Sequence, residues 1–146
     1  MSKLFLLFVI FCLIGSVKIY SQNHVLWDFS YDKSSEKIII KGTIDKGWHL
    51  YSQKTPLNAG PIPVSLNIAK QKGLKLIGHF SEQLEPHEVF DVNFDSKVYH
   101  FEESYFSTQK LKTKKPMQIS GTINFMVCDD TRCLPPIDVP FSILVK

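Results

Sequence analysis

Two cysteines, Cys128 and Cys133, are the residues whose type and spacing point most directly to chemistry. Four residues separate them. A disulfide requires its two Cα atoms to lie within about 4.4–6.8 Å of each other, so the chain must fold back between the cysteines if they are to bond. We therefore expect a tight connection here. The segment Leu134-Pro135-Pro136 that follows predicts an end to regular structure.

Three interpretations of this pair are open from its spacing. A structural disulfide is its usual role in a small exported domain, although closing a loop of about six residues contributes only roughly 2 kcal/mol. A structural zinc site needs four ligands, and the sequence offers no second cysteine pair. The third is a reversible dithiol that exchanges with other proteins, which requires two close sulfurs of which one is open to attack.

Charged neighbours make the two sulfurs unequal in the third interpretation. Arg132 directly precedes Cys133 and favours a thiolate there. Asp129 and Asp130 directly follow Cys128 and disfavour a thiolate at that position. The asymmetry predicts that Cys133 is the exchanging sulfur.

The segments around the pair have the pattern of short β-strands. Residues 119–127 alternate between apolar and polar side chains, which predicts a half-buried strand that ends at Cys128. Similar patterns predict strands at 25–31, 38–44, 48–51, 64–68, 74–77, 98–102 and 139–145. A long loop is expected at 81–95 and a basic turn at 110–115. About seven to nine short strands, with no helical period, favour an all-β sandwich.

The N-terminal segment predicts export. Lys3 precedes an apolar run from Leu4 to Ile14, which is too short to span a bilayer and has the charge and length of a signal-peptide core. We expect residues 1–21 to be removed as a signal peptide, and Cys12 with them. Residues 22–146 are then long enough for one domain in the periplasm, where disulfides persist.

Charge and motif content narrow the classes of function. Without Lys3 and Lys18, 15 of the 17 basic side chains remain against 14 acidic ones. A net charge so close to zero argues against nucleic acid or an anionic membrane as the main partner. The sequence has no Gly-rich phosphate loop, no Ser-His-Asp order and no clustered metal ligands, so we expect neither a cofactor nor a metal.

Two motifs together carry a resemblance to a known family. The first runs from Cys128 to Pro136 and is followed by a short final strand. The second is Lys46-Gly47-Trp48-His49-Leu50-Tyr51. In order, separation and residue type they resemble the paired cysteines with Pro-Pro, and the Gly-aromatic strand, of the N-terminal periplasmic domain of the thiol:disulfide interchange protein DsbD. The resemblance extends over roughly Trp27 to Val145.

The resemblance implies an immunoglobulin-like β-sandwich whose cysteines bridge two adjacent strands at one end. In that family the domain takes electrons from a thioredoxin-like domain fed by a membrane segment. It passes them to periplasmic disulfide isomerases and to thioredoxins of cytochrome c biogenesis. We therefore expect a monomeric thiol-disulfide exchange module that relays electrons between thioredoxin-fold partners. This sequence has no such membrane or thioredoxin-like segment, so a separate membrane electron-transfer protein should supply the reductant.

The resemblance also implies roles for individual positions. The family's second cysteine forms the mixed disulfide, and it corresponds to Cys133. Two aromatic residues of the Gly-aromatic strand lie near the family's active site, and their positions here are His49 and Tyr51. A mobile cap loop with an aromatic side chain shields the family's sulfurs. Its counterpart should lie between positions 81 and 94, with Phe90 as the candidate.

A rival interpretation stays open. His49 replaces a family aromatic, and it can carry protons at the thiols or simply pack. The cysteine spacing is one residue shorter than in the best-known enterobacterial form. The rival is a non-catalytic, immunoglobulin-like binding or assembly domain with a structural disulfide. A structural bond has a reduction potential below about −300 mV, whereas an exchanging one lies near the range of thioredoxins and isomerases.

Overall fold

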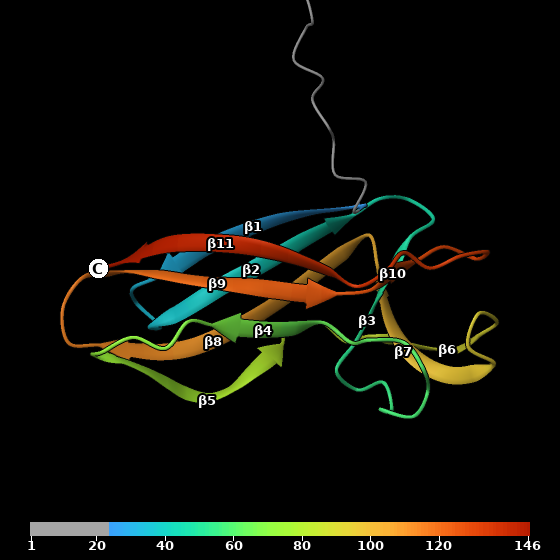
Figure 1. Cartoon of the computed structure of the whole chain (residues 1–146), viewed down its shortest axis with the longest axis horizontal. Coiled ribbons are helices and arrows are strands. Elements are labelled where there is room, and N and C mark those ends of the chain that lie inside the picture. The colour runs from blue at the N-terminus through green and yellow to red at the C-terminus, as the bar shows by residue number, and fades with distance from the viewer. Residues whose placement is uncertain (1–23) are drawn as a thin grey trace, which may run out of the picture.

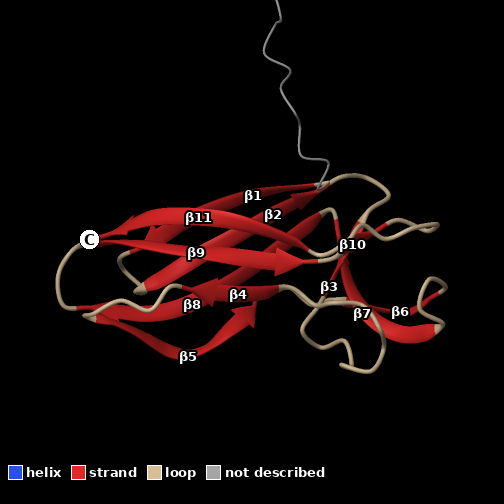
Figure 2. Cartoon of the chain, in the orientation of Figure 1, coloured by secondary structure: helices blue, strands red, loops and turns tan. Residues whose placement is uncertain are grey.

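The computed structural model describes residues 24–146, which form eleven β-strands and no helix (Figure 1, Figure 2). The all-β prediction is confirmed for this range. The expected signal peptide at 1–21, with Cys12, lies outside the described residues. Within 24–146 no helix is long and apolar enough to cross a membrane.

The strands form three antiparallel sheets. The first has the order β1 (Val25–Asp32), β2 (Lys37–Ile44), β8 (Ser104–Thr113), β5 (Leu74–Glu82). The second has the order β10 (Val127–Cys128), β3 (His49–Tyr51), β7 (Ser96–Glu102), β6 (His87–Asp91). The third has the order β11 (Ile137–Val145), β9 (Met117–Phe125), β4 (Ser65–Ile68). Figure 1 shows the second sheet at the right end of the molecule, away from the C-terminus.

Buried β-branched residues at alternate positions define the main core. Ile38 and Ile40 on β2, and Ile119 and Ile123 on β9, have no exposed surface and belong to one cluster. Successive side chains of a strand point to opposite faces, so residues such as Ser120 between them face solvent. Burying each isoleucine contributes about 1.5–3 kcal/mol, which makes this cluster the main support of the first and third sheets.

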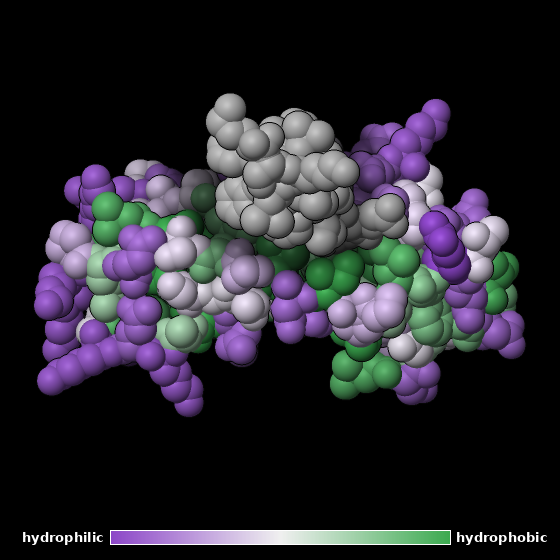
Figure 3. Space-filling view, turned by 45° about the horizontal axis from the view of Figure 1, so that its top comes forward, coloured by the Kyte–Doolittle hydropathy of each residue, from purple (hydrophilic) through white to green (hydrophobic). Residues whose placement is uncertain are grey.

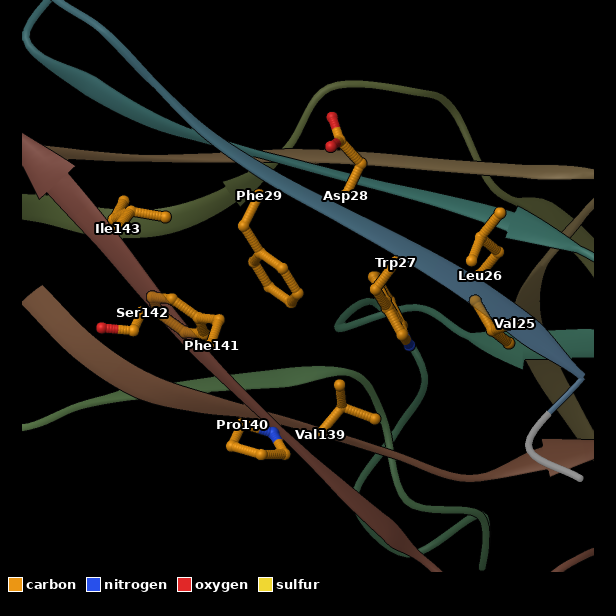
Figure 4. A pocket seen from close by; sticks show the side chains of 10 residues that line it. All are labelled: Val25, Leu26, Trp27, Asp28, Phe29, Val139, Pro140, Phe141, Ser142 and Ile143. Atoms are coloured by element: carbon orange, nitrogen blue, oxygen red, sulfur yellow. The ribbon is translucent and has the colours of Figure 1, made fainter. Parts of the chain in front are cut away.

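Aromatic rings close the sandwich between the edge strands β1 and β11. Figure 4 shows Trp27 and Phe29 of β1 and Phe141 of β11 pointing into the space between these strands. The rings of Phe29 and Phe141 stack with centroids 4.6 Å apart. Trp27 packs against Phe125 of β9 at 5.2 Å. A groove of about 470 Å³ remains along the seam, so side-chain packing rather than backbone pairing joins these edges.

Two expected connections are largely strands. The prediction of a long loop at 81–95 is wrong, because β5 continues to Glu82 and β6 pairs with β7 as a hairpin. The basic turn expected at 110–115 is wrong in its first part, because β8 continues to Thr113. Charged side chains are frequent in both segments, and they obscured the alternating pattern.

The strand β8 was missed from the sequence although it lies between β2 and β5. Its inward positions include Ser107 and Gln109, which are buried. Polar residues at inward positions hide the apolar alternation on which strand prediction depends. The Gln109 side-chain amide donates to the carbonyl oxygens of Ile77 and Lys110, at 3.2 and 2.8 Å. These two hydrogen bonds offset the cost of burying the Gln109 amide group.

The strand expected to end at Cys128 is divided in two. β9 ends at Phe125 and pairs with β11 and β4 in the third sheet. After Met126 the chain enters the second sheet, where β10 pairs with β3. The predicted end of regular structure at 134–136 is confirmed, and β11 begins at Ile137.

We predict that Gly121→Ala destabilises the domain. A Cβ here would overlap the Asn67 carbonyl oxygen and lie 2.7 Å from Phe141 Cζ. The carbonyl belongs to the paired strand β4 and cannot move away easily, and overpacking of this kind costs about 1–3 kcal/mol. Urea unfolding should show the loss, whereas Ser120→Ala on the exposed side of β9 should change stability by less than about 0.5 kcal/mol. Equal stabilities for Gly121→Ala and wild type would contradict this packing.

Candidate functional site

Cys128 and Cys133 form a disulfide with an S–S distance of 1.98 Å and a Cα–Cα distance of 4.0 Å. The predicted fold-back is a narrow hairpin. Leu134 N donates to the Val127 carbonyl oxygen, and Asp129 N donates to the Arg132 carbonyl oxygen, both at 2.9 Å. The cysteines are the direct cross-strand pair between these two hydrogen bonds. Cα atoms approach most closely at such positions, which explains a separation below the expected range.

The Asp129 side chain organises the turn of this hairpin. Its Oδ1 accepts hydrogen bonds from Thr131 N, Thr131 Oγ1 and Arg132 N, each at 2.8 Å. These bonds, those from Thr131 first, lower the pKa of Asp129, so its carboxylate stays charged. Arg132 Nε lies 3.6 Å from Asp129 Oδ2, and its guanidinium lies 5.6 Å from the centroid of the Trp48 ring. The charge of Arg132 is therefore directed at Asp129 and Trp48.

The second sheet separates the main core from the disulfide. Successive side chains point to opposite faces. Leu50 and Val127 are cross-strand partners that enter the main core. Cys128 and His49 are also cross-strand partners, and with Tyr51 they lie on the other face. The predicted neighbours His49 and Tyr51 are therefore on the same face as the disulfide.

A small apolar cluster surrounds the disulfide on this face. It buries Cys128 completely and leaves Cys133 half-buried. Its members are Tyr51, Ala59, Val98 and Cys128, with Val89, Phe94, Met126 and Cys133 packed against them. Only one of the two sulfur-bearing residues thus has surface that a partner can reach.

Phe94 is the aromatic residue from the predicted cap region that joins this cluster. It follows β6 and meets the Tyr51 ring edge-on, with centroids 5.9 Å apart. Phe94 also covers Gly60, whose φ of +108° favours glycine and where a Cβ would lie 2.5 Å from Phe94 Cδ1. Phe90 is 60% exposed, and strand alternation places it on the face of β6 opposite to Val89. The structure does not bring Phe90 into the disulfide cluster.

A chain of hydrogen bonds, buried at His49, Tyr51 and Asp91 and exposed at Asn93, links β3, β6 and the cysteine hairpin. The Tyr51 hydroxyl donates to Asp91 Oδ2 at 2.6 Å, and His49 Nε2 lies 3.1 Å from the same hydroxyl. Asn93 N donates to Asp91 Oδ1 at 2.8 Å, and Asn93 Nδ2 donates to the Asp129 carbonyl oxygen at 3.1 Å. Asp91 and Asn93 were not recognised from the sequence, because the 81–95 segment had no regular pattern.

The hydrogen bonds of this chain define the proton positions on His49. Since the single Tyr51 hydroxyl proton is donated to Asp91, His49 Nε2–H must donate to the Tyr51 oxygen. Nδ1 of a neutral His49 then carries no proton. Burial, and then the hydrogen bond to Asp91, raise the pKa of Tyr51, so the hydroxyl keeps its proton.

A second buried histidine lies beside His49. The rings of His49 and His100 are 4.7 Å apart, and His100 Nε2 lies 3.2 Å from Glu102 Oε1. Burial lowers the pKa values of both histidines, and their nearness lowers that of His100 further. They line a pocket of about 450 Å³, together with Val89, Phe90, Asp91, Val92, Asn93, Glu102, Asp129 and Asp130. Among residues 24–146 no group of three or more histidine, cysteine, aspartate or glutamate side chains is placed to hold a metal ion.

The amino-acid sequence matches a known protein family over most of its length. Residues 16–143 match the family described as Thiol:disulfide interchange protein DsbD, N-terminal. The chain belongs to the DsbD N-terminal domain family. The resemblance inferred from the cysteine motif and the Gly-aromatic strand is confirmed. No curated protein sequence matches the chain.

Solved structures of DsbD N-terminal domains share the fold. The Neisseria meningitidis domain in its reduced form has a TM-score of 0.59 and 14% identity, over 86% of this chain and 89% of that one. The complex between the DsbD and PilB N-terminal domains of Neisseria meningitidis has values of 0.61 and 12%, over 86% and 87%. The N-terminal periplasmic domain of ScsB from Proteus mirabilis has values of 0.60 and 15%, over 90% and 49%. The fold is the predicted immunoglobulin-like β-sandwich.

We predict that acid destabilises the folded domain as the pH falls below about 6.5, the ordinary pKa of histidine. Burial lowers the pKa values of His49 and His100 in the folded state. The unfolded chain therefore binds more protons in this range than the folded chain, so stability falls with pH. The melting temperature should drop between about pH 7.5 and about pH 5.5.

His100→Gln should reduce this drop, because it removes one of the two buried histidines and keeps a side chain that can form hydrogen bonds. His79→Gln removes an exposed histidine from β5 and should leave the drop unchanged. Equal drops in the wild type and both variants would contradict the role of burial.

Proposed function

We propose that this domain relays electrons between thioredoxin-fold proteins through the Cys128–Cys133 disulfide. The observation that carries the proposal is the unequal exposure of the two cysteines, of which Cys128 is fully buried and Cys133 half-buried. In thiol-disulfide exchange one sulfur must be reached by the attacking thiolate, while the leaving sulfur needs no access. Cys133 is therefore the attacked sulfur, and Cys128 the leaving and resolving one.

The hairpin supports exchange over a purely structural bond. Two backbone hydrogen bonds close it on either side of the disulfide, and three more to Asp129 hold its turn. These bonds hold the hairpin closed in the folded domain without the disulfide, and a disulfide across so short a loop restricts the unfolded chain only slightly. A disulfide across it adds at most roughly 2 kcal/mol. The rival, a non-catalytic binding domain with a structural disulfide, gains little from a bond in this place.

Exchange proceeds in two steps. A thiolate of a reduced partner attacks Cys133 Sγ, and the Cys128–Cys133 bond breaks with its electron pair passing to Cys128. The partner's second thiolate then attacks the partner sulfur of the mixed disulfide and releases Cys133. The partner is oxidised and the domain has gained two electrons. The reverse sequence passes these electrons to an oxidised partner.

His49 is placed to exchange a proton with Cys128. It is the cross-strand neighbour of Cys128, and the hydrogen bonds of Tyr51 leave its Nδ1 unprotonated. Burial keeps the pKa of His49 below the ordinary value, so the neutral ring can accept the Cys128 thiol proton in the reverse sequence, where Cys128 must become a thiolate to resolve the mixed disulfide. Tyr51 and Asp91 hold the ring in this orientation.

Neighbouring charges support Cys133 as the attacked sulfur less strongly than its exposure does. Arg132 contacts Asp129 and Trp48, and Asp130 is exposed beside the pocket. That Arg132 favours a thiolate at Cys133, and that the two aspartates disfavour one at Cys128, stay predictions. Unequal burial favours the same assignment without depending on them.

Phe94 takes the role of the cap aromatic in this proposal. It lies within the predicted window 81–94 and packs in the disulfide cluster, which Phe90 does not. Movement of the β6–β7 turn would take Phe94 away from Cys133 and admit a partner. Phe90 is exposed at the rim of the pocket, where it can contact that partner.

The family supports a proposal for the partners and the compartment. The Neisseria meningitidis DsbD N-terminal domain forms a complex with the PilB N-terminal domain, and the Proteus mirabilis ScsB domain is periplasmic. By analogy this domain works in the periplasm after loss of its signal peptide. It acts as a monomer that receives electrons from a membrane electron-transfer protein and serves thioredoxin-fold acceptors, including those of cytochrome c biogenesis.

The assignment of the two sulfurs predicts asymmetric trapping. Cys128→Ala should accumulate a mixed disulfide with a thioredoxin-fold protein of a periplasmic extract, because the resolving thiol is gone. Cys133→Ala should trap much less, because its remaining thiol is buried. Non-reducing electrophoresis and mass spectrometry identify the adducts.

Equal trapping by both variants would remove the assignment of roles. If neither variant captures a partner and the wild-type bond also resists dithiothreitol, the disulfide is structural and the relay is refuted.

Loss of the cap aromatic should expose the sulfurs. In the reduced protein, Phe94→Ala should speed alkylation of Cys133 by iodoacetamide several-fold, because its ring covers the cluster. Phe90→Ala is the matched control and should leave the rate unchanged, since its ring lies outside that cluster. The opposite result would return the cap role to Phe90.

A further inference from the structure

The basic residues of this domain gather at the end opposite to the disulfide. The end consists of the β1–β2 turn, the segment leading into β5, the β8–β9 turn with the adjoining strand ends, and the C-terminus, all at the left of Figure 1. It carries ten lysines: Lys33, Lys37, Lys70, Lys72, Lys75, Lys110, Lys112, Lys114, Lys115 and Lys146. Figure 3 shows hydrophilic side chains gathered at the same end.

The pairing of strands and loops brings these lysines together. Lys37 is the cross-strand partner of Lys110, and Lys75 is the partner of Lys112. The β8–β9 turn lies against the segment before β5, because Lys114 N donates to the Gly73 carbonyl oxygen at 3.3 Å. Lysines from four separate segments thus form one surface, called the lysine end below.

The cations of the two ends differ in their partners. At the disulfide end three cations have an anionic partner, in the pairs Lys54–Glu85, Lys97–Glu88 and Arg132–Asp129. In the described part of the chain none of the ten lysines of the lysine end forms an ion pair. The acidic residues at this end are Asp32 and Glu36, and the Asp32 carboxylate already accepts hydrogen bonds from Ser34 and Ser35.

This arrangement is unfavourable for the domain alone. Like charges directly opposite each other on paired strands destabilise a sheet. Two such lysine pairs lie on the first sheet at this end. An anionic surface placed against the lysines would attract them and so offset their mutual repulsion.

The lysine end also has apolar side chains at its surface. A pocket of about 430 Å³ is lined by Lys72, Gly73, Lys114, Lys115 and Met117. Leu76 on β5 is 43% exposed near Lys70, with which it lines a neighbouring pocket. Exposed apolar side chains among lysines fit the interface of a bilayer, where lipid head groups give way to acyl chains.

We propose that the lysine end binds the surface of an anionic phospholipid bilayer. The lysines project from strand ends and loops over a whole end of the molecule, which matches an extended anionic surface better than a single anion. Neither of the two pockets at this end is lined by an aromatic residue on which nucleic acid bases could stack. The disulfide, at the other end, then faces away from the lipid and stays open to partners.

Vesicle sedimentation tests this proposal with the protein in its exported form. Wild type should bind vesicles that contain phosphatidylglycerol, should not bind vesicles of phosphatidylcholine alone, and should dissociate as salt is raised. Each lysine near an anionic surface contributes roughly fivefold to partitioning, so the triple variant K72Q/K114Q/K115Q should bind about a hundredfold less.

The matched control is K46Q/K54Q/K97Q, which removes the same charge from elsewhere on the domain. It should retain binding within a few-fold. Equal losses of vesicle binding in both triple variants would show that binding depends only on net charge, which would overturn the proposal. So would binding by wild type to soluble heparin, but not to phosphatidylglycerol vesicles, because the site would then serve a soluble polyanion.

The test is independent of the redox proposal. K72Q/K114Q/K115Q should reduce and reoxidise in solution at the wild-type rate, since its changes lie far from the disulfide. Failure of vesicle binding with normal exchange would overturn this inference alone. Normal vesicle binding with a disulfide inert to dithiothreitol would overturn the relay alone.

Discussion

The pairing of the two-residue strand β10 with β3 is the constraint on which the site depends. It removes the chain from the third sheet after Met126 and fixes Cys128 opposite His49. Because side chains alternate along a strand, the same pairing sends Val127 into the main core and Cys128 to the other face. A slip of one residue would exchange these positions and bury the disulfide in the core. The register of the β10–β3 pairing thus determines both which side chains enter the core and which lie at the site.

The polar groups beside the disulfide are rigid because they satisfy one another. Asp91 accepts from Tyr51 and from Asn93, and Asn93 in turn holds the Asp129 carbonyl oxygen. Polar groups in such surroundings are costly unless hydrogen-bonded, so the network favours a single arrangement of β3, β6 and the hairpin. The exception is His100 Nδ1, which is buried without a partner. The network therefore combines a fixed geometry with two histidines, His49 and His100, whose pKa values burial lowers.

Local patterns in the sequence were sufficient for the cysteine fold-back and the all-β class, and the family resemblance supplied the expected positions of His49 and Tyr51 near the disulfide. They were insufficient where tertiary contacts decide. β8 has polar inward residues, and Phe94 and Phe90 differ only in which face the folded chain gives them. The near-zero net charge was also uninformative, since 15 basic and 14 acidic side chains give no hint that ten of the lysines gather at one end. Such features depend on which segments meet in space, which a single sequence does not record.

The complete burial of Cys128 also bears on chemical damage. Peroxides oxidise thiolates that they can reach, first to sulfenic acid and then irreversibly to sulfinic and sulfonic acids. In this fold a peroxide meets Cys133 before Cys128, whose surface is closed by Tyr51, Val98 and Ala59. A sulfenic acid formed at Cys133 lies next to a preserved thiol that can condense with it to restore the disulfide. The packing that makes the two sulfurs unequal thereby makes the first oxidative lesion reversible.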